Sequence, residues 1–443
     1  MKLDKKFIGA TTLVVALVFS GCGGGSDSSS EDAGITAAQK KAVLTTYADI
    51  ALANYTDALS DAEALQTAIN TFVTTPTQTN FDAAKAAWLT ARESYGTTEA
   101  FRLSEGPIDA EEGFGATFGA PEGQLNAWPL DENMIDYTTA ADGSTTSGNI
   151  IDTTGVFTPS GDEATEVNVT TITKEALASL NENGGDANVA TGYHSIEFLL
   201  WGQDQDYNSF VADTVTNGAL VAGQRPLTDF TSAANADRRL AYLQAAADLM
   251  VDDLQSMVDA WTSGTGSYRE ALLGGGTNAI DADEALTQIF AGLGVFIKSE
   301  LANERMAVAV LTPSEEDEHS CFSDNTHRDI TLNYEGFRNI IKGEYPKGTS
   351  KGTSFYSLLS SSTKAEVDTL IETIDTGVDA IDTAAATEHF DYQIQSGSSY
   401  RQNIVDTKNS MRDLGDEMVD VAADFGISLT EDDVTDPDET VIE

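Results

Sequence analysis

The chain has 443 residues, of which 72 are acidic and 24 are basic, so its formal net charge is −48. A surface this acidic repels nucleic-acid phosphates and anionic membranes, which excludes nucleic-acid binding as a function. Hydrophobic residues make up 41% of the chain, as in ordinary globular proteins, which excludes wholesale disorder. Solubility is the plainer explanation of the negative charge, although such a surface also attracts cations.

The amino-terminal segment has the order of a secretory signal: a basic start, a short apolar run, and small residues before a cysteine. Lys2, Lys5 and Lys6 form the start, residues 7–19 form the apolar run, and Ser20-Gly21 precede Cys22. The layout resembles a bacterial lipoprotein signal, which predicts a signal over residues 1–22 with lipidation at Cys22. A plainly secreted protein is the alternative.

Residues 23–35 are rich in glycine and serine and are predicted to form a flexible tether. We expect a lipid-anchored protein of the cell envelope that contacts the membrane through Cys22 only, with no later segment crossing it. Gly23 is not the aspartate that retains lipoproteins in the inner membrane of enteric bacteria, so the outer membrane is favoured, facing the periplasm or the cell surface. The only other cysteine is Cys321, so the fold does not depend on disulfides.

The first predicted domain spans residues 36–217. Apolar residues recur at helical spacing over 36–74, a break follows at 74–77, and a second helix is expected to begin with Asn80 as its cap and to continue to Phe101. Residues 110–173 are rich in threonine, glycine and aspartate and are predicted to be irregular. Two further helices are predicted at 174–181 and 192–201.

The second predicted domain spans residues 218–430, and an acidic, frayed tail is expected at 431–443. Four more segments show helical periodicity, at 237–261, 279–311, 363–386 and 400–425. No segment shows sustained alternation of apolar and polar residues. The predicted fold is therefore all-α, with two helical-bundle domains packed together and a long irregular insertion in the first.

The segment from Gly192 to Gly202 contains the candidate for chemistry, His194-x-x-Glu197. Residues three apart share one face of a helix, so this imidazole and this carboxylate are able to bind the same ion. Apolar neighbours bury the helix, and an ionisable pair in such surroundings needs a partner or a metal. Without further context, a core histidine bonded to a carboxylate explains the motif as well.

Three segments give the chain a resemblance to the imelysin family, which includes insulin-cleaving envelope metallopeptidases and iron-regulated lipoproteins. The first is Gly192-x-His194-x-x-Glu197 with Phe198-Leu199-Leu200-Trp201-Gly202 after it. The second comprises Trp88, Arg92, Glu99-Ala100-Phe101 and Gly106-Pro107-Ile108-Asp109. The third comprises residues 300–306 and 316–327, and it resembles the branch that cyanobacterial iron-regulated protein A typifies. The resemblance covers most of the chain after the tether.

The resemblance implies a metal site formed by His194, Glu197, Glu99 and Asp109. Three carboxylates and one imidazole suit one divalent or trivalent ion with a preference for oxygen, so iron is favoured and zinc is possible. Read from the residues alone, Trp88, Arg92, Tyr95 and Glu99 form one helical stripe, in which Arg92 orients or neutralises an acidic pocket. Asp109 serves equally well as a helix cap.

Residues 315–327 contain a second cluster, with His319, Cys321, Asp324 and His327. A cysteine among histidines and acids is able to bind metal or to act in redox chemistry. Serine, aspartate and asparagine in the same stretch are turn and capping residues, so we favour a structural role or the lining of a cleft between the bundles. His389 is expected to be exposed.

Three functions remain open at this point. The first is binding and handling of a metal ion or metal chelate, with iron acquisition together with other envelope iron-uptake proteins as its favoured form. The second is a metallopeptidase of the imelysin type with Glu197 as its base, although the chain has no His-Glu-x-x-His motif. The third is a non-catalytic module that binds a ligand between the bundles.

Overall fold

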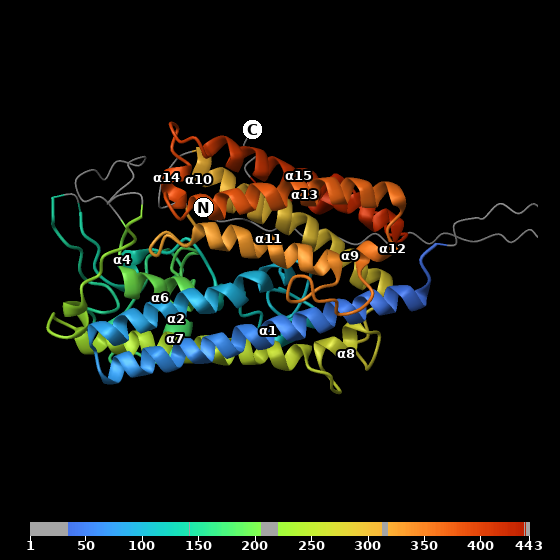
Figure 1. Ribbon diagram of the computed structural model, residues 1–443. Helices are drawn as coiled ribbons and strands as arrows, with labels where there is room; N and C mark the ends of the chain where they lie inside the picture. Colours follow the sequence, from blue (N-terminus) through green and yellow to red (C-terminus); the bar gives the residue numbers. More distant parts are fainter. Residues whose placement is uncertain (1–33, 141, 205–219, 312–317, 438, 440–443) are drawn as a thin grey trace, which may run out of the picture. The chain divides into compact units, whose positions relative to one another are not determined.

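The computed structural model describes residues 34–140, 142–204, 220–311, 318–437 and 439 (Figure 1). These residues form an all-helical protein with one two-stranded sheet, so the predicted fold class is confirmed. The predicted signal, the lipidation site at Cys22 and nearly all of the tether lie outside the described residues.

Two long helices open the described chain, α1 (Ala37–Thr74) and α2 (Gln78–Gly96). A 3-10 turn, η1 (Thr97–Phe101), extends α2 to the residue at which the predicted helix ends. Thr36 and Gln39 form a capping box at the start of α1, which satisfies two of its free backbone amides. The cap of α2 was wrongly predicted, because Thr77 accepts the hydrogen bond from the amide of Asn80.

The segment between α2 and α6 is irregular over residues 110–173, as predicted, and it includes a helix close to the one predicted at 174–181. It contains only short elements: η2 (Gly115–Phe118), α3 (Glu122–Leu125), α4 (Glu132–Ile135), the antiparallel strands β1 (Val156–Phe157) and β2 (Val167–Asn168), and α5 (Lys174–Leu180). Its glycines and polar residues bury too little apolar surface for longer helices. The motif helix α6 (Gly192–Trp201) follows.

The carboxyl-terminal half contains the four predicted helices within three residues of their expected ends. The elements are η3 (Leu227–Phe230), α7 (Ala236–Trp261), α8 (Tyr268–Leu272), α9 (Ala282–Val295), the π-helix η4 (Phe296–Ala307), α10 (Val308–Leu311), α11 (Thr326–Lys342), α12 (Phe355–Leu358), α13 (Ser361–Ala384), α14 (Phe390–Gln393), α15 (Arg401–Asp424) and η6 (Glu431–Val434).

The long helices pack in two groups (Figure 1). The first contains α1, α2, α6 and α7, and the second contains α9, η4, α11, α13 and α15. Helix α7 follows the predicted boundary at residue 218, yet it packs against α1 and α6. Helix α11 contacts α2 and η1, and it therefore joins the second group to the first.

Among the long helices of the described residues, α11 is the one that was not predicted from the sequence. Its buried residues Ile330, Tyr334, Phe337 and Ile341 follow helical spacing, but asparagines and Gly336 lower its local helix propensity. Gly336 is required by packing, since a Cβ atom there would lie 2.3 Å from the carbonyl oxygen of Thr97. The close approach of α11 to η1 therefore depends on the residue that weakens the helical signal.

The continuous helical segment 282–311 is long and apolar enough to cross a membrane by composition, contrary to the expectation that no such segment follows the signal. About 72% of its most apolar window is buried inside the fold, which is typical of a core helix. Its centre is the π-helix η4, whose wider turn favours contact between residues five apart. Glu300 and Arg305 use this spacing, with Oε1 and Nη2 2.7 Å apart.

The acidic tail was wrongly predicted to be frayed throughout. Val434 in η6 is fully buried and lies against Gly294 of α9, where a Cβ atom would be 2.6 Å from the valine side chain. Further along, Arg412 forms an ion pair with the nearly buried Glu439 at 2.8 Å. Apolar burial at Val434 and the ion pair at Glu439 hold these two residues of the tail against α9 and α15.

On α7, replacing Asp253 with asparagine is expected to stabilise the protein at neutral pH. Burial and then Asp252 raise the pKa of Asp253 to about 7, and its Oδ2 is buried without a hydrogen-bond partner among the described residues. The folded state therefore binds this proton more tightly than the unfolded state, so this group makes stability fall as the pH rises from about 4 to about 7.

Urea unfolding at several pH values measures the effect. The increase in the free energy of unfolding caused by Asp253→Asn should grow from near zero at pH 4 to about 2 kcal/mol at pH 7 and stay constant above pH 7. This figure is reduced because the group is partly exposed to solvent. Asp259→Asn, at an exposed position of the same helix, is the control and should show no such dependence. A gain that is independent of pH would contradict the assignment to this carboxyl group.

Candidate functional site

Helix α6 places His194 and Glu197 together in the protein interior. The side chains are 1% and 0% exposed, and Nδ1 of His194 lies 2.9 Å from Oε2 of Glu197. Every residue of α6 is buried, because its apolar side chains pack around the whole helix. The predicted sharing of one helical face is therefore confirmed, and in this structure the two side chains bond to each other.

The second oxygen of Glu197 is held by Ser323, which lies in the loop before α11. Its backbone amide and its hydroxyl donate hydrogen bonds to Oε1, at 2.9 and 2.7 Å. Both oxygens of the glutamate therefore have partners. Ser323 was interpreted as a turn or capping residue, and its bond to Glu197 was not predicted, because 126 residues separate the two.

Burial makes the uncharged forms of the pair favourable. Desolvation raises the pKa of Glu197 to about 8, although the bonds from Ser323 oppose this shift, and it lowers the pKa of His194 to about 3. Both shifts favour a neutral imidazole beside a carboxyl group with a proton between them. The other ring nitrogen of His194, Nε2, is buried and has no hydrogen-bond partner among the described residues.

His319 is the nearest imidazole, with its ring centroid 4.6 Å from that of His194 and the two rings nearly perpendicular. Its Nδ1 lies 2.8 Å from Oδ2 of Asp329, on the first turn of α11. The bond to a carboxylate fixes the ring and favours a proton on Nδ1, which leaves Nε2 as an acceptor. The predicted cleft residue His319 therefore lies directly beside the motif.

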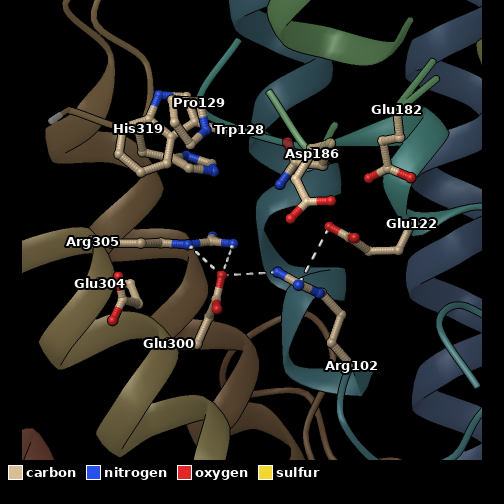
Figure 2. Close-up of a pocket in the computed structure, with 12 residues that line it drawn as sticks. Arg102, Glu122, Trp128, Pro129, Glu182, Asp186, Glu300, Glu304, Arg305 and His319 are labelled. Carbon is tan, nitrogen blue, oxygen red and sulfur yellow. Dashed lines mark hydrogen bonds and ion pairs between the residues drawn. The ribbon is translucent and has the colours of Figure 1, made fainter. Parts of the chain in front are cut away.

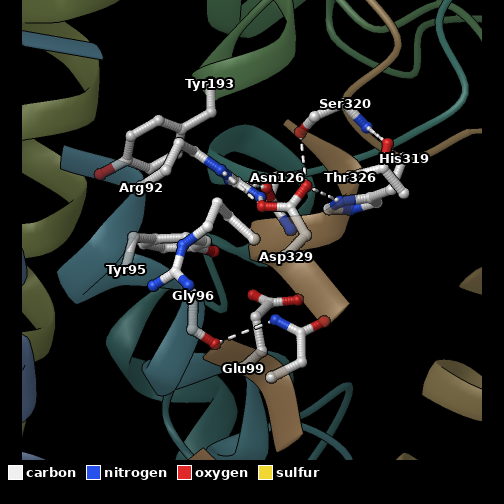
Figure 3. A network of polar contacts seen from close by, with 12 residues as sticks. Arg92, Tyr95, Gly96, Glu99, Asn126, Tyr193, His319, Ser320, Thr326 and Asp329 are labelled. Carbon is white, nitrogen blue, oxygen red and sulfur yellow. Dashed lines mark hydrogen bonds and ion pairs between the residues drawn. The ribbon is translucent and has the colours of Figure 1, made fainter. Parts of the chain in front are cut away.

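Asp329 lies at the centre of a buried network (Figure 3). Its Oδ1 accepts hydrogen bonds from Arg92 Nε and Nη2 at 3.2 and 2.8 Å, and its Oδ2 bonds to His319 and Ser320. Although burial opposes ionisation, Arg92 and the other partners hold the pKa of Asp329 well below its usual range. Asp329 therefore carries a full negative charge that Arg92 balances.

Arg92 is buried in the protein interior and does not line an acidic pocket as predicted. Its guanidinium lies 5.0 to 5.7 Å from the ring centroids of Tyr193, Tyr95 and Trp88, and Nη1 donates to Asn126 at 2.6 Å. The predicted stripe of α2 and η1 is thus buried as a unit. Trp88 also donates from Nε1 to the carbonyl oxygen of Tyr193 at 2.9 Å, which joins α2 to α6.

Glu99, a predicted metal ligand, forms ion pairs with two arginines. Its Oε2 lies 2.6 Å from Arg305 Nη2 and 3.3 Å from Arg102 Nη1. Although burial acts in the opposite direction, these cations lower the pKa of Glu99 to about 2. Glu300 shares both arginines, so the four side chains form a network of two positive and two negative charges, to which Glu122 is joined through Arg102 at 3.5 Å.

A polar cavity of about 260 Å³ opens beside this set (Figure 2). His319 and Trp128 line one part of it, and Glu182 and Asp186 lie across from them. Its charged lining consists of two arginines and five carboxylates, namely Arg102, Arg305, Glu122, Glu182, Asp186, Glu300 and Glu304. The cavity lining therefore has more carboxyl groups than arginines, and its residue His319 is the one that packs against His194.

Asp109 does not join the other predicted ligands. It accepts a hydrogen bond from the amide of Leu103 at 2.7 Å and faces a separate cavity of about 300 Å³ beside Glu105 and Asp436. Burial raises its pKa to about 6. Of the four predicted ligands, only His194 and Glu197 contact each other. In the described ranges, no three His, Cys, Asp or Glu side chains surround one point as a metal site requires.

The remaining predicted residues lie at the edge of the site. Cys321 is half-buried and forms no disulfide within the described chain. His327 is on α11, with Nδ1 3.1 Å from the carbonyl oxygen of Asp324 and Nε2 3.8 Å from Asp382. The expectation that His389 is exposed was wrong, because its side chain is 19% exposed and bonds to Asp324.

The chain is similar to known proteins both in sequence and in structure. The imelysin profile, peptidase family M75, matches residues 51–418. Iron-regulated protein A of Synechococcus elongatus is 24% identical over 364 residues, which are 80% of this chain and 76% of that protein. A crystal structure from Parabacteroides distasonis, of a protein described as an iron-regulated protein A precursor, has a TM-score of 0.64 at 18% identity and covers 89% of this chain and 97% of its own.

Proposed function

The chain belongs to the imelysin family, and from this premise we propose that it binds iron at the bacterial cell envelope through His194 and Glu197. The match to a protein named for its regulation by iron supports the choice of metal. The signal-like amino terminus and Cys22 support an envelope lipoprotein, lipid-anchored and favouring the outer membrane.

The observation that carries the proposal is the buried Nε2 of His194, which has no hydrogen-bond partner in the described residues. A buried polar atom without a partner costs about 1–3 kcal/mol, and such a cost is typical of functional sites. A neutral imidazole binds iron through the nitrogen that carries no proton, so an ion at Nε2 displaces any proton on that atom. Binding through Glu197 as well would replace the present bond between the two side chains.

The surrounding charges permit a cation. Arg92 and Arg305 are the nearest positive side chains of the network, but Asp329 neutralises the first, and Glu99 and Glu300 neutralise the second. The cavity beside them has three more carboxylates than arginines. A cation, alone or as a small chelate, is therefore attracted toward His319 and the pair behind it.

The proximity of His319 makes a metallopeptidase the second candidate. The motif itself supplies one imidazole, whereas hydrolytic zinc sites use two or three histidines with a carboxylate and a water. The ring of His319, 4.6 Å from that of His194, supplies a second imidazole that sequence spacing did not predict. Cleavage of an unfolded basic peptide that is abolished by both a chelator and Glu197→Gln would favour this candidate over iron handling.

Elemental mass spectrometry of the purified protein, after exposure to iron, zinc, manganese and calcium in turn, tests the proposal. We expect about one ion of iron per chain at the motif and its loss in His194→Ala and Glu197→Ala. Glu372→Ala, at an exposed position of α13, is the control and should retain it. If folded His194→Ala keeps its iron, or if folded wild-type protein binds none, the proposal is wrong.

A further inference from the structure

The polar cavity beside His319 has features that the proposed iron site does not use (Figure 2). Its walls come from the turn after η1, from α3 and residues 126–129, from the loop after α5 and from η4. Its volume of about 260 Å³ lies just below the roughly 300–1,000 Å³ of small-molecule sites. The cavity is therefore large enough for one extended side chain with the groups beside it.

Both arginines of the lining are already bound to carboxylates. Arg305 donates from Nη2 to Glu99 and Glu300, at 2.6 and 2.7 Å. Arg102 forms ion pairs with the same two glutamates and with Glu122, at 3.3, 2.9 and 3.5 Å. An anionic ligand would have to displace these carboxylates, so the cavity is unsuited to phosphates and to negatively charged chelates.

Three further carboxylates of the lining, Glu182, Asp186 and Glu304, form no ion pair with a lysine or arginine of the described residues. Glu182 and Asp186 lie across the cavity from Trp128 (Figure 2). Burial and then Asp186 raise the pKa of Glu182, and burial raises the pKa of Glu122 to about 7 although Arg102 opposes this shift. A positive group placed in the cavity would relieve the repulsion among these carboxylates.

Two buried side chains that line the cavity show which other groups a ligand needs. Asn126 is 3% exposed and its Oδ1 accepts from Arg92, but its Nδ2 has no hydrogen-bond partner among the described residues. A buried amide donor without a partner is costly, and an oxygen atom of a ligand would satisfy it. Burial lowers the pKa of His319 to about 3, so this imidazole stays uncharged and does not repel a cation.

We propose that this cavity binds a lysine-type side chain together with the carbonyl oxygen of an adjoining amide, either in a small lysine derivative or in one residue of a basic peptide. The ammonium group bonds to carboxylates of the lining, Glu182 and Asp186 among them. The carbonyl oxygen accepts from Nδ2 of Asn126, and the alkyl chain lies against Trp128. This binding goes beyond the proposed iron site and does not depend on it.

Isothermal titration calorimetry on the whole protein, freed of metal by EDTA, tests the proposal. The main probe is N-acetyl-lysine methylamide, a single lysine residue with an amide on each side, and we expect one molecule to bind per chain. N-acetyl-norleucine methylamide lacks only the ammonium group and should bind at least roughly tenfold more weakly. Pentylamine has the ammonium group but no amide, and it should also bind more weakly than the lysine probe.

A double variant at two exposed positions, Glu182→Gln with Asp186→Asn, tests the lining without disturbing the core. It should bind the lysine probe at least roughly fivefold more weakly than wild type. The net charge of −48 attracts any cation, so the control also removes two negative charges. Asp162→Asn with Glu166→Gln, at exposed positions between β1 and β2 and outside the cavity, should bind the probe as tightly as wild type.

Three results would overturn the proposal: no binding to folded wild-type protein, equal binding of the norleucine probe, or equal losses in the two double variants. Equal binding of pentylamine would overturn the contact between the amide and Asn126. A Gly-Gly-Lys-Gly-Gly peptide with blocked ends identifies the source of the ligand. Tighter binding than that of the single residue assigns the cavity to a peptide, and weaker binding assigns it to a small lysine derivative.

Discussion

Replacing Asp329 with alanine is expected to lower the free energy of unfolding by about 3–5 kcal/mol, because it leaves a buried arginine without its counter-ion. Arg92 is 0% exposed and would keep only Asn126 as a polar partner. The imidazole of His319 and the hydroxyl of Ser320 would lose their acceptor as well. Urea unfolding followed by circular dichroism measures the loss.

The matched control for this prediction is an ion pair at the surface. Asp368 bonds to Lys342 of α11 at 2.8 Å and is 51% exposed. Water screens such a pair, so Asp368→Ala should cost no more than about 1 kcal/mol. Asp329→Asn keeps the shape of the side chain and removes its charge, and it should fall between the two. Equal losses at positions 329 and 368 would show that the buried network is not what stabilises the junction of α2 and α11.

Replacing Gly192 with alanine is expected to cost about 2–5 kcal/mol and to reduce iron retention. Gly192 has φ of +79°, a conformation that costs other residues about 1–2 kcal/mol. A Cβ atom there would also lie 2.4 Å from the carbonyl oxygen of Leu125, and such overpacking adds about 1–3 kcal/mol. Relief of the clash would move the first turn of α6, which carries His194.

Gly148→Ala separates the two contributions. Gly148 also has a positive φ, of +88°, but nothing lies within 4 Å of a Cβ atom placed on it. This variant should show the backbone cost alone and should retain its iron. If Gly192→Ala is no less stable than Gly148→Ala, then α3 gives way to the added methyl group and the glycine of the motif is not needed for packing.

The candidate site was predictable where its residues are close in sequence. The three-residue spacing of His194 and Glu197 is sufficient to put both on one face of a helix, and the apolar residues around them indicate burial. The stripe from Trp88 to Glu99 is likewise buried as a unit. Helical periodicity is a local property, so it can be recognised in a single sequence without knowledge of the fold.

The partners of these residues were not predictable in the same way. Arg92 bonds to Asp329 and Glu99 bonds to Arg305, over separations of 237 and 206 residues. Arg92 was related to an acidic pocket from its neighbours within two turns of helix, whereas Glu99 was related to a metal by the family resemblance. Neither Asp329 nor Arg305 was singled out, although Asp329 follows His327 by two residues and Glu300-x-x-x-x-Arg305 was part of the family resemblance.

By itself, the sequence determined the all-α fold, the ends of most long helices and the pairing within the motif, because periodicity and side-chain spacing act over one or two turns. Only the tertiary structure decided that α11 brings Asp329 to Arg92, that His319 stands beside His194, and that Asp109 faces another cavity. A buried charge must be balanced by the side chains that lie near it in the folded protein. Packing determines which side chains these are, and it brings together segments that are hundreds of residues apart in the sequence.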